Sequence, residues 1–144
     1  MNNRFKFRVF ISDKENSKNS LTRMFKVHSL HTGTNKVIIT SSHGNYSIKL
    51  ENNVLMQCTG LRDKNGRLIY EGDIVRFKDC NDILVINYQE EMACFAPQFY
   101  CNGEYGDRLW FDDYDSSECQ FHKSNNFEII GNIYENKELL ESEG

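Results

Sequence analysis

The segment LMQCTGLRDKNGRLIYEGDIV, residues 55–75, contains the strongest fold signal in this chain of 144 residues. Apolar runs on both sides of Asn65-Gly66 predict two antiparallel strands joined by a tight turn, because Asn-Gly is strongly preferred in β-hairpins. Gly60, Gly66 and Gly72 are spaced six residues apart, each where a strand has to bend or reverse. The segment therefore predicts a β-meander in which the glycines have structural roles.

Extended segments separated by turns continue on both sides of this hairpin. In residues 4–11 apolar and basic side chains alternate, which predicts an opening strand with Arg4, Lys6 and Arg8 on one face. Further strands are expected over residues 24–30, 37–40, 46–50, 92–101, 108–111 and 127–134.

Two expected strands carry information about their place in a sheet. Residues 83–86 are apolar at every position, which predicts a central strand covered on both faces. Pro97 is the only proline of the chain. Because proline cannot donate a ladder hydrogen bond, it predicts an edge or a bulge in the strand over residues 92–101.

Turn signals recur about every ten residues, a spacing typical of small barrels and sandwiches. The tail over residues 136–141 is expected to form one or two helical turns, with Asn136 as the N-cap. We therefore expect a mainly β fold, a small antiparallel barrel with additional strands and a short C-terminal helical turn. The length fits a single domain over residues 1–144.

Composition narrows the classes of function. The net charge of −4 disfavours nonspecific attraction of the whole molecule to phosphate backbones or anionic membranes. No apolar run approaches the roughly 20 residues that span a bilayer, and the first residues lack a signal peptide. The five cysteines are odd in number and contain no Cys-x-x-Cys pair, which favours reduced thiols in a cytoplasmic protein.

Two segments together resemble the signature of the YopX family: residues 55–75 and FEIIGNIYEN, residues 127–136. The beginning, with KFR at residues 6–8 and DKE at residues 13–15, is also similar. The chain departs from the family pattern at Cys58, where an aromatic residue is common, and at Lys137, where proline is common. The resemblance implies a phage or prophage protein with N-terminal strands over residues 1–53 and an SH3-like barrel portion over residues 54–144. It implies no activity, because the family is uncharacterised.

No metal, cofactor or catalytic residue is assigned from the sequence. His28 and His31 would point to opposite faces of a regular strand, so they would not share one ion. The acidic residues 112–118 lack EF-hand spacing, because Glu118 falls where that loop requires glycine. Cys119 and His122 are close in sequence, which by itself does not indicate a catalytic pair. The sequence thus favours a noncatalytic protein and leaves an enzyme of unknown class open.

Two kinds of binding surface remain, and neither involves a membrane. The leading hypothesis is a protein-interaction module that forms a homo-oligomer or binds a host factor, because Tyr and Trp are favoured at interface centres. Its candidate residues are Tyr105, Arg108, Trp110, Phe111 and Tyr114. The alternative is a nucleic-acid-binding module that uses basic strand faces. Its candidate residues are Arg4, Lys6, Arg8, Lys64, Arg67, Arg76 and Lys78, among which the acids Glu71 and Asp73 are interspersed.

Overall fold

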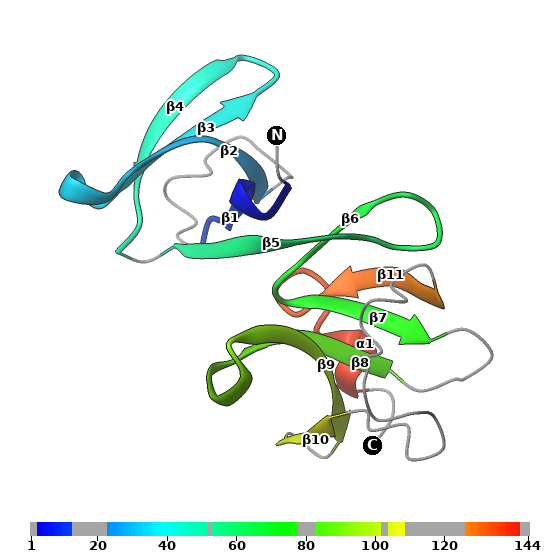
Figure 1. The fold of residues 1–144 in the computed structure, drawn as a ribbon. Helices are drawn as coiled ribbons and strands as arrows, with labels where there is room; N and C mark the ends of the chain where they lie inside the picture. Colours follow the sequence, from blue (N-terminus) through cyan, green and yellow to red (C-terminus); the bar gives the residue numbers. More distant parts are fainter. Residues whose placement is uncertain are drawn as a thin grey trace. The chain divides into compact units, whose positions relative to one another are not determined.

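The computed structural model describes residues 3–12, 23–51, 53–77, 83–101, 104–108 and 126–141 (Figure 1). The mainly β fold expected from the sequence is confirmed for these residues. The strands are β1 (Phe7–Phe10), β2 (Met24–His31), β3 (Lys36–Ser41), β4 (Gly44–Lys49), β5 (Val54–Arg62), β6 (Leu68–Tyr70), β7 (Asp73–Phe77), β8 (Ile83–Gln89), β9 (Cys94–Cys101), β10 (Glu104–Arg108) and β11 (Phe127–Asn132). One α-helix, α1 (Glu138–Glu141), follows the last strand.

The strands form two antiparallel sheets. One has six strands in the order β4-β3-β2-β1-β5-β6, and the other has five in the order β10-β9-β8-β7-β11. The closed barrel expected from the sequence is wrong for the described strands. Strand β5 runs on through Gly60, which has a positive φ of 87°, and the strands from β7 onward pair among themselves instead of closing the first sheet.

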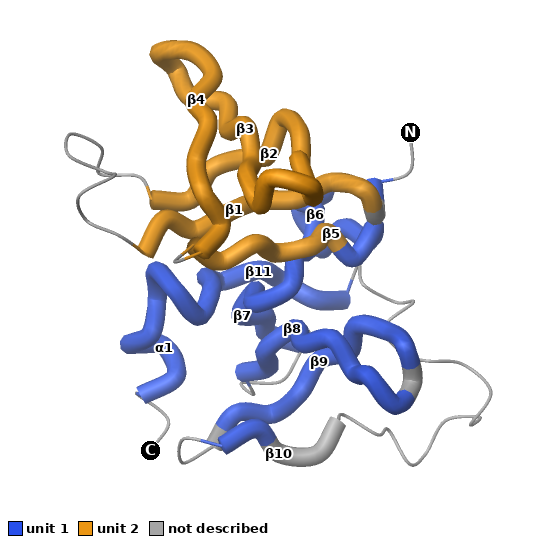
Figure 2. Tube along the Cα trace, turned by 90° about the vertical axis from the view of Figure 1, so that its left-hand side faces the viewer, with its two compact units in different colours: residues 1–3, 59–144 blue, residues 4–58 orange. Residues whose placement is uncertain are grey.

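The chain divides into two compact units, coloured in Figure 2. Unit 2 comprises Arg4–Cys58, and unit 1 comprises Met1–Asn3 and Thr59–Gly144. The division falls inside β5, so this strand contributes residues to both units.

In unit 2 an apolar core lies on one face of the sheet formed by β1–β4 and the start of β5. Val9, Val37 and Ile39 are buried there, and register places Val9 opposite both Phe25 and Leu55. Strand β2 contains a register shift between Val27 and Ser29. The shift lets Leu30 reach the same core as Phe25 and Val27, although a strict period of two would turn Leu30 outward.

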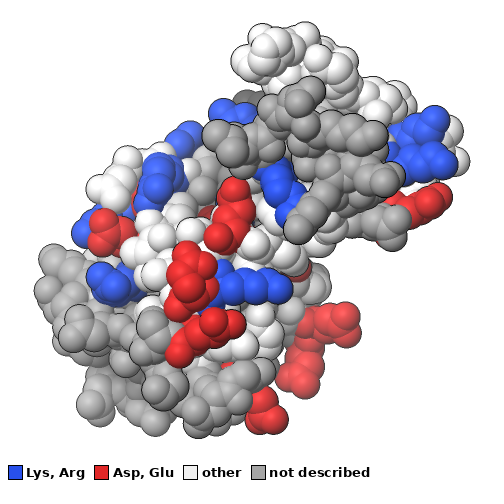
Figure 3. Space-filling model, turned by 180° about the vertical axis from the view of Figure 1, so that it is seen from behind, with Lys and Arg blue, Asp and Glu red and all other residues white. Residues whose placement is uncertain are grey.

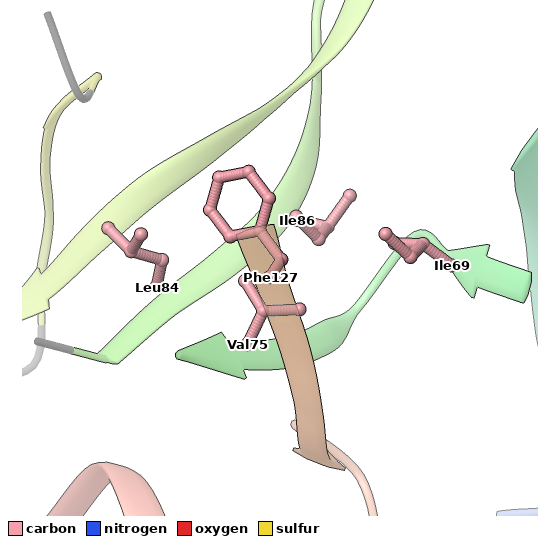
Figure 4. Close-up of a cluster of buried hydrophobic side chains, with 5 residues drawn as sticks. All are labelled: Ile69, Val75, Leu84, Ile86 and Phe127. Carbon is pink, nitrogen blue, oxygen red and sulfur yellow. The ribbon is translucent and has the colours of Figure 1, made fainter. Parts of the chain in front are cut away.

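Unit 1 has apolar clusters on both faces of the five-stranded sheet. Ile69, Val75, Leu84, Ile86 and Phe127 converge on one face (Figure 4). On the other face Ile74, Ile83 and Val85 are buried, and Leu139 and Leu140 of α1 pack against them. All four residues 83–86 are buried, which confirms the central, doubly covered strand that uniform apolarity predicted.

Two local expectations are wrong. Asn3–Phe5 form a 3-10 turn, so the opening strand begins only at Phe7 and Arg4 does not share a strand face with Arg8. Pro97 is not on an edge strand, since β9 lies between β8 and β10 and pairs with β8 in an unbroken register. The irregular pairing instead occurs on the other side of β9, where β10 shifts register between Tyr105 and Arg108.

Candidate functional site

The turn after β5 is organised by the buried carboxylate of Asp63, whose exposure is 3%. Its Oδ1 accepts hydrogen bonds from the backbone N–H groups of Asn65 and Arg67, each at 2.9 Å. Its Oδ2 accepts one from Ile129 N at 3.1 Å and lies 3.4 Å from Arg67 Nη2. Lys64 N donates to Phe127 O at 2.9 Å. Asp63 therefore fixes the β5–β6 hairpin and ties it to β11.

The bends on either side of this hairpin are fixed in a similar way. Thr59 Oγ1 donates to Ile69 O at 2.9 Å across the hairpin and accepts from Leu61 N at 3.1 Å, around the bend at Gly60. Asp73 is buried, and its Oδ2 accepts a hydrogen bond from Tyr70 N at 2.8 Å. The polar side chains of this segment thus bond to the backbone of their own turns.

The second signature segment closes β11 in the same manner. Asn132 Oδ1 accepts from Tyr134 N and Glu135 N at 3.1 and 2.9 Å. Asn136 Oδ1 accepts from Asn132 N at 3.1 Å, so this side chain is turned back toward β11. A Cβ on Gly131 would lie 2.6 Å from Asn136 Oδ1. The side chains of both signature segments therefore build the scaffold of unit 1.

The basic candidates of unit 1 lie beside acidic groups. Lys64 forms an ion pair with Glu128 at 2.9 Å, and Arg67 reaches Asp63 and Ile129 O. Arg76 is exposed and lies opposite Glu128 in the register of β7 and β11. Hydrogen bonding to Lys64 is the main cause that holds the pKa of Glu128 below its ordinary value, and the charges of Lys64 and Arg76 add to it. Lys78 lies outside the described residues.

The basic candidates of unit 2 are not brought into one row. Lys6 is exposed, and its carbonyl accepts a hydrogen bond from Cys58 N at 2.9 Å. Arg8 is half-buried and lies directly opposite Lys26 in the register of β1 and β2. Arg4 belongs to the 3-10 turn.

Of the aromatic candidates, Tyr105 lies on β10, the last strand in the order of its sheet, and is 46% exposed. Its ring meets that of Tyr100 edge to face, with the centroids 5.2 Å apart. Burial raises the pKa of Tyr105, against the opposing effect of its hydrogen bond with the Asn87 side chain. Arg108 ends β10, whereas Trp110, Phe111 and Tyr114 lie outside the described residues.

The sheet of unit 2 has an exposed surface that the sequence interpretation missed, on the side of β2–β4 opposite the core. Register places three rows of side chains there: Lys26, Thr40 and Asn45; Ser29, Ile38 and Ser47; His31, Lys36 and Lys49. The four basic side chains are all exposed. We call these nine residues the basic face.

Charge is divided unequally between the two units. Unit 2 contains nine Lys or Arg and three Asp or Glu, a formal charge of +6, whereas the remainder of the chain has eight and eighteen, a charge of −10. The thirty-five residues from Asn16 to Leu50 contain no acidic residue. On the face shown in Figure 3, most of the acidic surface lies over unit 1. This run without acidic residues is the feature of the sequence from which the basic face could have been predicted.

Two further findings concern other classes of site. In the described parts of the chain, no group of three or more His, Cys, Asp or Glu residues is placed to hold a metal ion. Among the same residues, no helix has the length and apolar character that crossing a membrane would require.

Comparisons with known proteins identify the family. No curated protein matches the sequence. The crystal structure of protein EF1440 from Enterococcus faecalis is similar, with a TM-score of 0.53 and 25% sequence identity, over 94% of this chain and 96% of that one. The family described as YopX protein matches residues 6–141. Because this match covers almost the whole sequence, the chain belongs to the YopX family.

Proposed function

We propose that this protein is a noncatalytic binding module of a phage or prophage, and that it holds an anionic partner against the basic face of unit 2. Membership of the YopX family supports the phage origin. The hydrogen bonds within both signature segments support a scaffold whose function lies on its surfaces rather than in the motif. The observation that carries the proposal is the charge of +6 on unit 2.

The basic face is suited to an anion because its cations lie close together. Lys36 is directly opposite Lys49, and directly opposed side chains have Cβ atoms about 5 Å apart. Like charges at that distance repel one another, so binding of an anionic partner reduces the electrostatic repulsion within the free sheet. Strands β2–β4 contain no acidic residue that would neutralise them.

Retention of the full-length protein on immobilised heparin tests this proposal. We expect Lys36→Glu to elute at lower salt than both the wild type and Lys137→Glu, a matched control that makes the same charge change at an exposed lysine of unit 1. Far-ultraviolet circular dichroism would verify that both variants are folded. A wild-type protein that is not retained, or two variants that elute together, would contradict the proposal.

The aromatic edge at β10 favours a second function, self-association. Tyr105 is held against Tyr100 by ring contact and hydrogen-bonded to Asn87, so an exposed aromatic is already ordered before any partner binds. We expect an oligomeric mass by light scattering and a smaller mass for Tyr105→Ala. A monomeric wild type at high concentration would exclude this function and leave the first one intact.

A further inference from the structure

We infer that the anionic partner of the basic face is duplex DNA, contacted through its phosphates across the major groove. This inference rests on the proposed function, because it names the partner of the same surface. Seven of the nine residues of the basic face are exposed, and the spacing and chemistry of their side chains restrict what can bind there.

The dimensions of the face match a groove of B-form DNA. Lys26 and Lys36 mark its two ends. Lys26 pairs with Thr40, and Thr40 and Lys36 are four residues apart along β3. At the usual rise per residue of a strand, the two ends are therefore about 13 Å apart. The major groove of B-DNA is about 12 Å wide. Lys26 at one end and the pair Lys36 and Lys49 at the other are therefore spaced to reach phosphates on the two sides of the groove.

The neutral residues of the face are of the kinds that contact nucleic acid. Ser29, Ser47, Thr40 and Asn45 are small hydrogen-bonding side chains, which commonly contact phosphates and base edges. Ser29 and Ser47 occupy the central row with Ile38, and Thr40 and Asn45 lie in the end row beside Lys26. Two adjacent β-strands are known to contact the major groove, and β4, the edge strand of its sheet, pairs with β3 over six consecutive residue pairs.

The same residues make other nucleic acids poorer partners. Single strands are usually bound by aromatic side chains on which the bases stack, and neither β3 nor β4 presents an aromatic residue on this face, since Tyr46 pairs with Ile39 on the core side. Duplex RNA has a deep, narrow major groove that side chains cannot enter. The width of the face and its side chains therefore favour B-form DNA.

Fluorescence anisotropy with the full-length protein provides the test. The probes are a labelled 20-base-pair DNA duplex, the duplex RNA of the same sequence, and the corresponding single-stranded DNA. We expect the tightest binding to duplex DNA, with a slope of log affinity against log salt of about −3 if three lysines release counterions. Each of Lys26→Ala, Lys36→Ala and Lys49→Ala should weaken binding and make the slope less negative by about one, whereas Lys137→Ala should change neither the affinity nor the slope.

The outcomes separate this inference from the function on which it rests. Retention on heparin that depends on Lys36, together with equal affinity for all three nucleic acids or none for any, would overturn the inference while the proposed function stands. Absence of heparin retention would overturn both. Binding to duplex DNA that the three lysine variants leave unchanged would place the DNA elsewhere and would also overturn the inference.

Discussion

At the scale of single residues, the fold of unit 1 depends most visibly on Asp63. Burial raises the pKa of this carboxyl, but hydrogen bonds from the backbone of Ile129, Arg67 and Asn65, together with the charge of Arg67, outweigh that effect. The pKa in the folded protein is therefore lower than in the unfolded chain. Asp63 thus stabilises the fold at pH values above the ordinary carboxyl pKa, and the contribution is lost as the pH falls through the lowered value.

We expect Asp63→Asn to lower the free energy of unfolding by about 2–3 kcal/mol at pH 7. The amide oxygen can still accept the hydrogen bonds from Asn65 N and Arg67 N. The amide NH₂ group then faces the N–H group of Ile129, so that two hydrogen-bond donors point at each other. Urea unfolding at pH 7 and near pH 3 measures both the loss and its pH dependence. The difference in the free energy of unfolding between variant and wild type should be smaller at the lower pH. A difference that does not change with pH would contradict a stabilising role of the negative charge of Asp63.

Gly131 offers a second residue-scale test, because its surroundings leave no room for a methyl group. A Cβ there would lie 2.6–2.9 Å from three atoms of the Asn136 side chain, which is held by its hydrogen bond to Asn132 N. We expect Gly131→Ala to destabilise the protein by about 1–3 kcal/mol in urea unfolding. Gly33→Ala is the matched control, since nothing lies within 4 Å of its added Cβ. Equal effects of the two substitutions would contradict this packing.

At the scale of elements, the shifted register of β2 decides which side chains reach the core of unit 2. Leu30 lies opposite Val37 and packs in that core, whereas Ser29 lies opposite Ile38 on the basic face. We expect Leu30→Ala to lower the stability to urea by about 1–3 kcal/mol and Ser29→Ala to have little effect. A larger effect at Ser29 would mean that β2 continues in strict alternation.

Local patterns predicted those elements whose environment is uniform along the strand. Residues 83–86 are apolar throughout because both faces of β8 are covered, and Asn65-Gly66 marks a turn in which Gly66 has a φ of 79°. The same reasoning failed at Arg4, because alternation of apolar and basic residues continues through a 3-10 turn that has no strand partner of its own. Whether strands close a barrel depends on pairings that alternation does not encode.

The basic face could not be assembled from local spacing. Lys36 and Lys49 are thirteen residues apart and meet only through the register of β3 and β4. His31 joins them because β2 shifts register before it. Basic candidates chosen for proximity in sequence, such as Lys64 and Arg67, lie instead beside the acids Glu128 and Asp63.

At the scale of the whole molecule, the net charge of −4 conceals two units of opposite sign. The overall charge argues against nonspecific binding to polyanions, yet fields act locally once charges are separated by more than the Debye length of about 8–10 Å. Charges within that distance of one another on a surface, rather than the sum over the chain, therefore determine what that surface attracts.

The continuity of β5 leads to a prediction about folding. Residues 54–57 pair with β1, and the same strand continues to Thr59 and Leu61, which pack and bond within unit 1. If one unit unfolds, its half of β5 loses its order, and the half that belongs to the other unit loses the strand that continues it. We therefore expect residues 1–144 to unfold as one cooperative domain. Leu84→Ala in unit 1 and Ile39→Ala in unit 2 remove buried side chains, and each should cost about 2–5 kcal/mol.

Hydrogen exchange with mass spectrometry in increasing urea would test this cooperativity, because peptides from the two units report separately. If the units are coupled through β5, either substitution should lower the midpoint measured on peptides of both units by a similar amount. Substitutions that act only on their own unit would show that the two halves of β5 unfold independently. The prediction of a single domain would then be wrong, because Gly60 would act as a hinge between two separately stable folds.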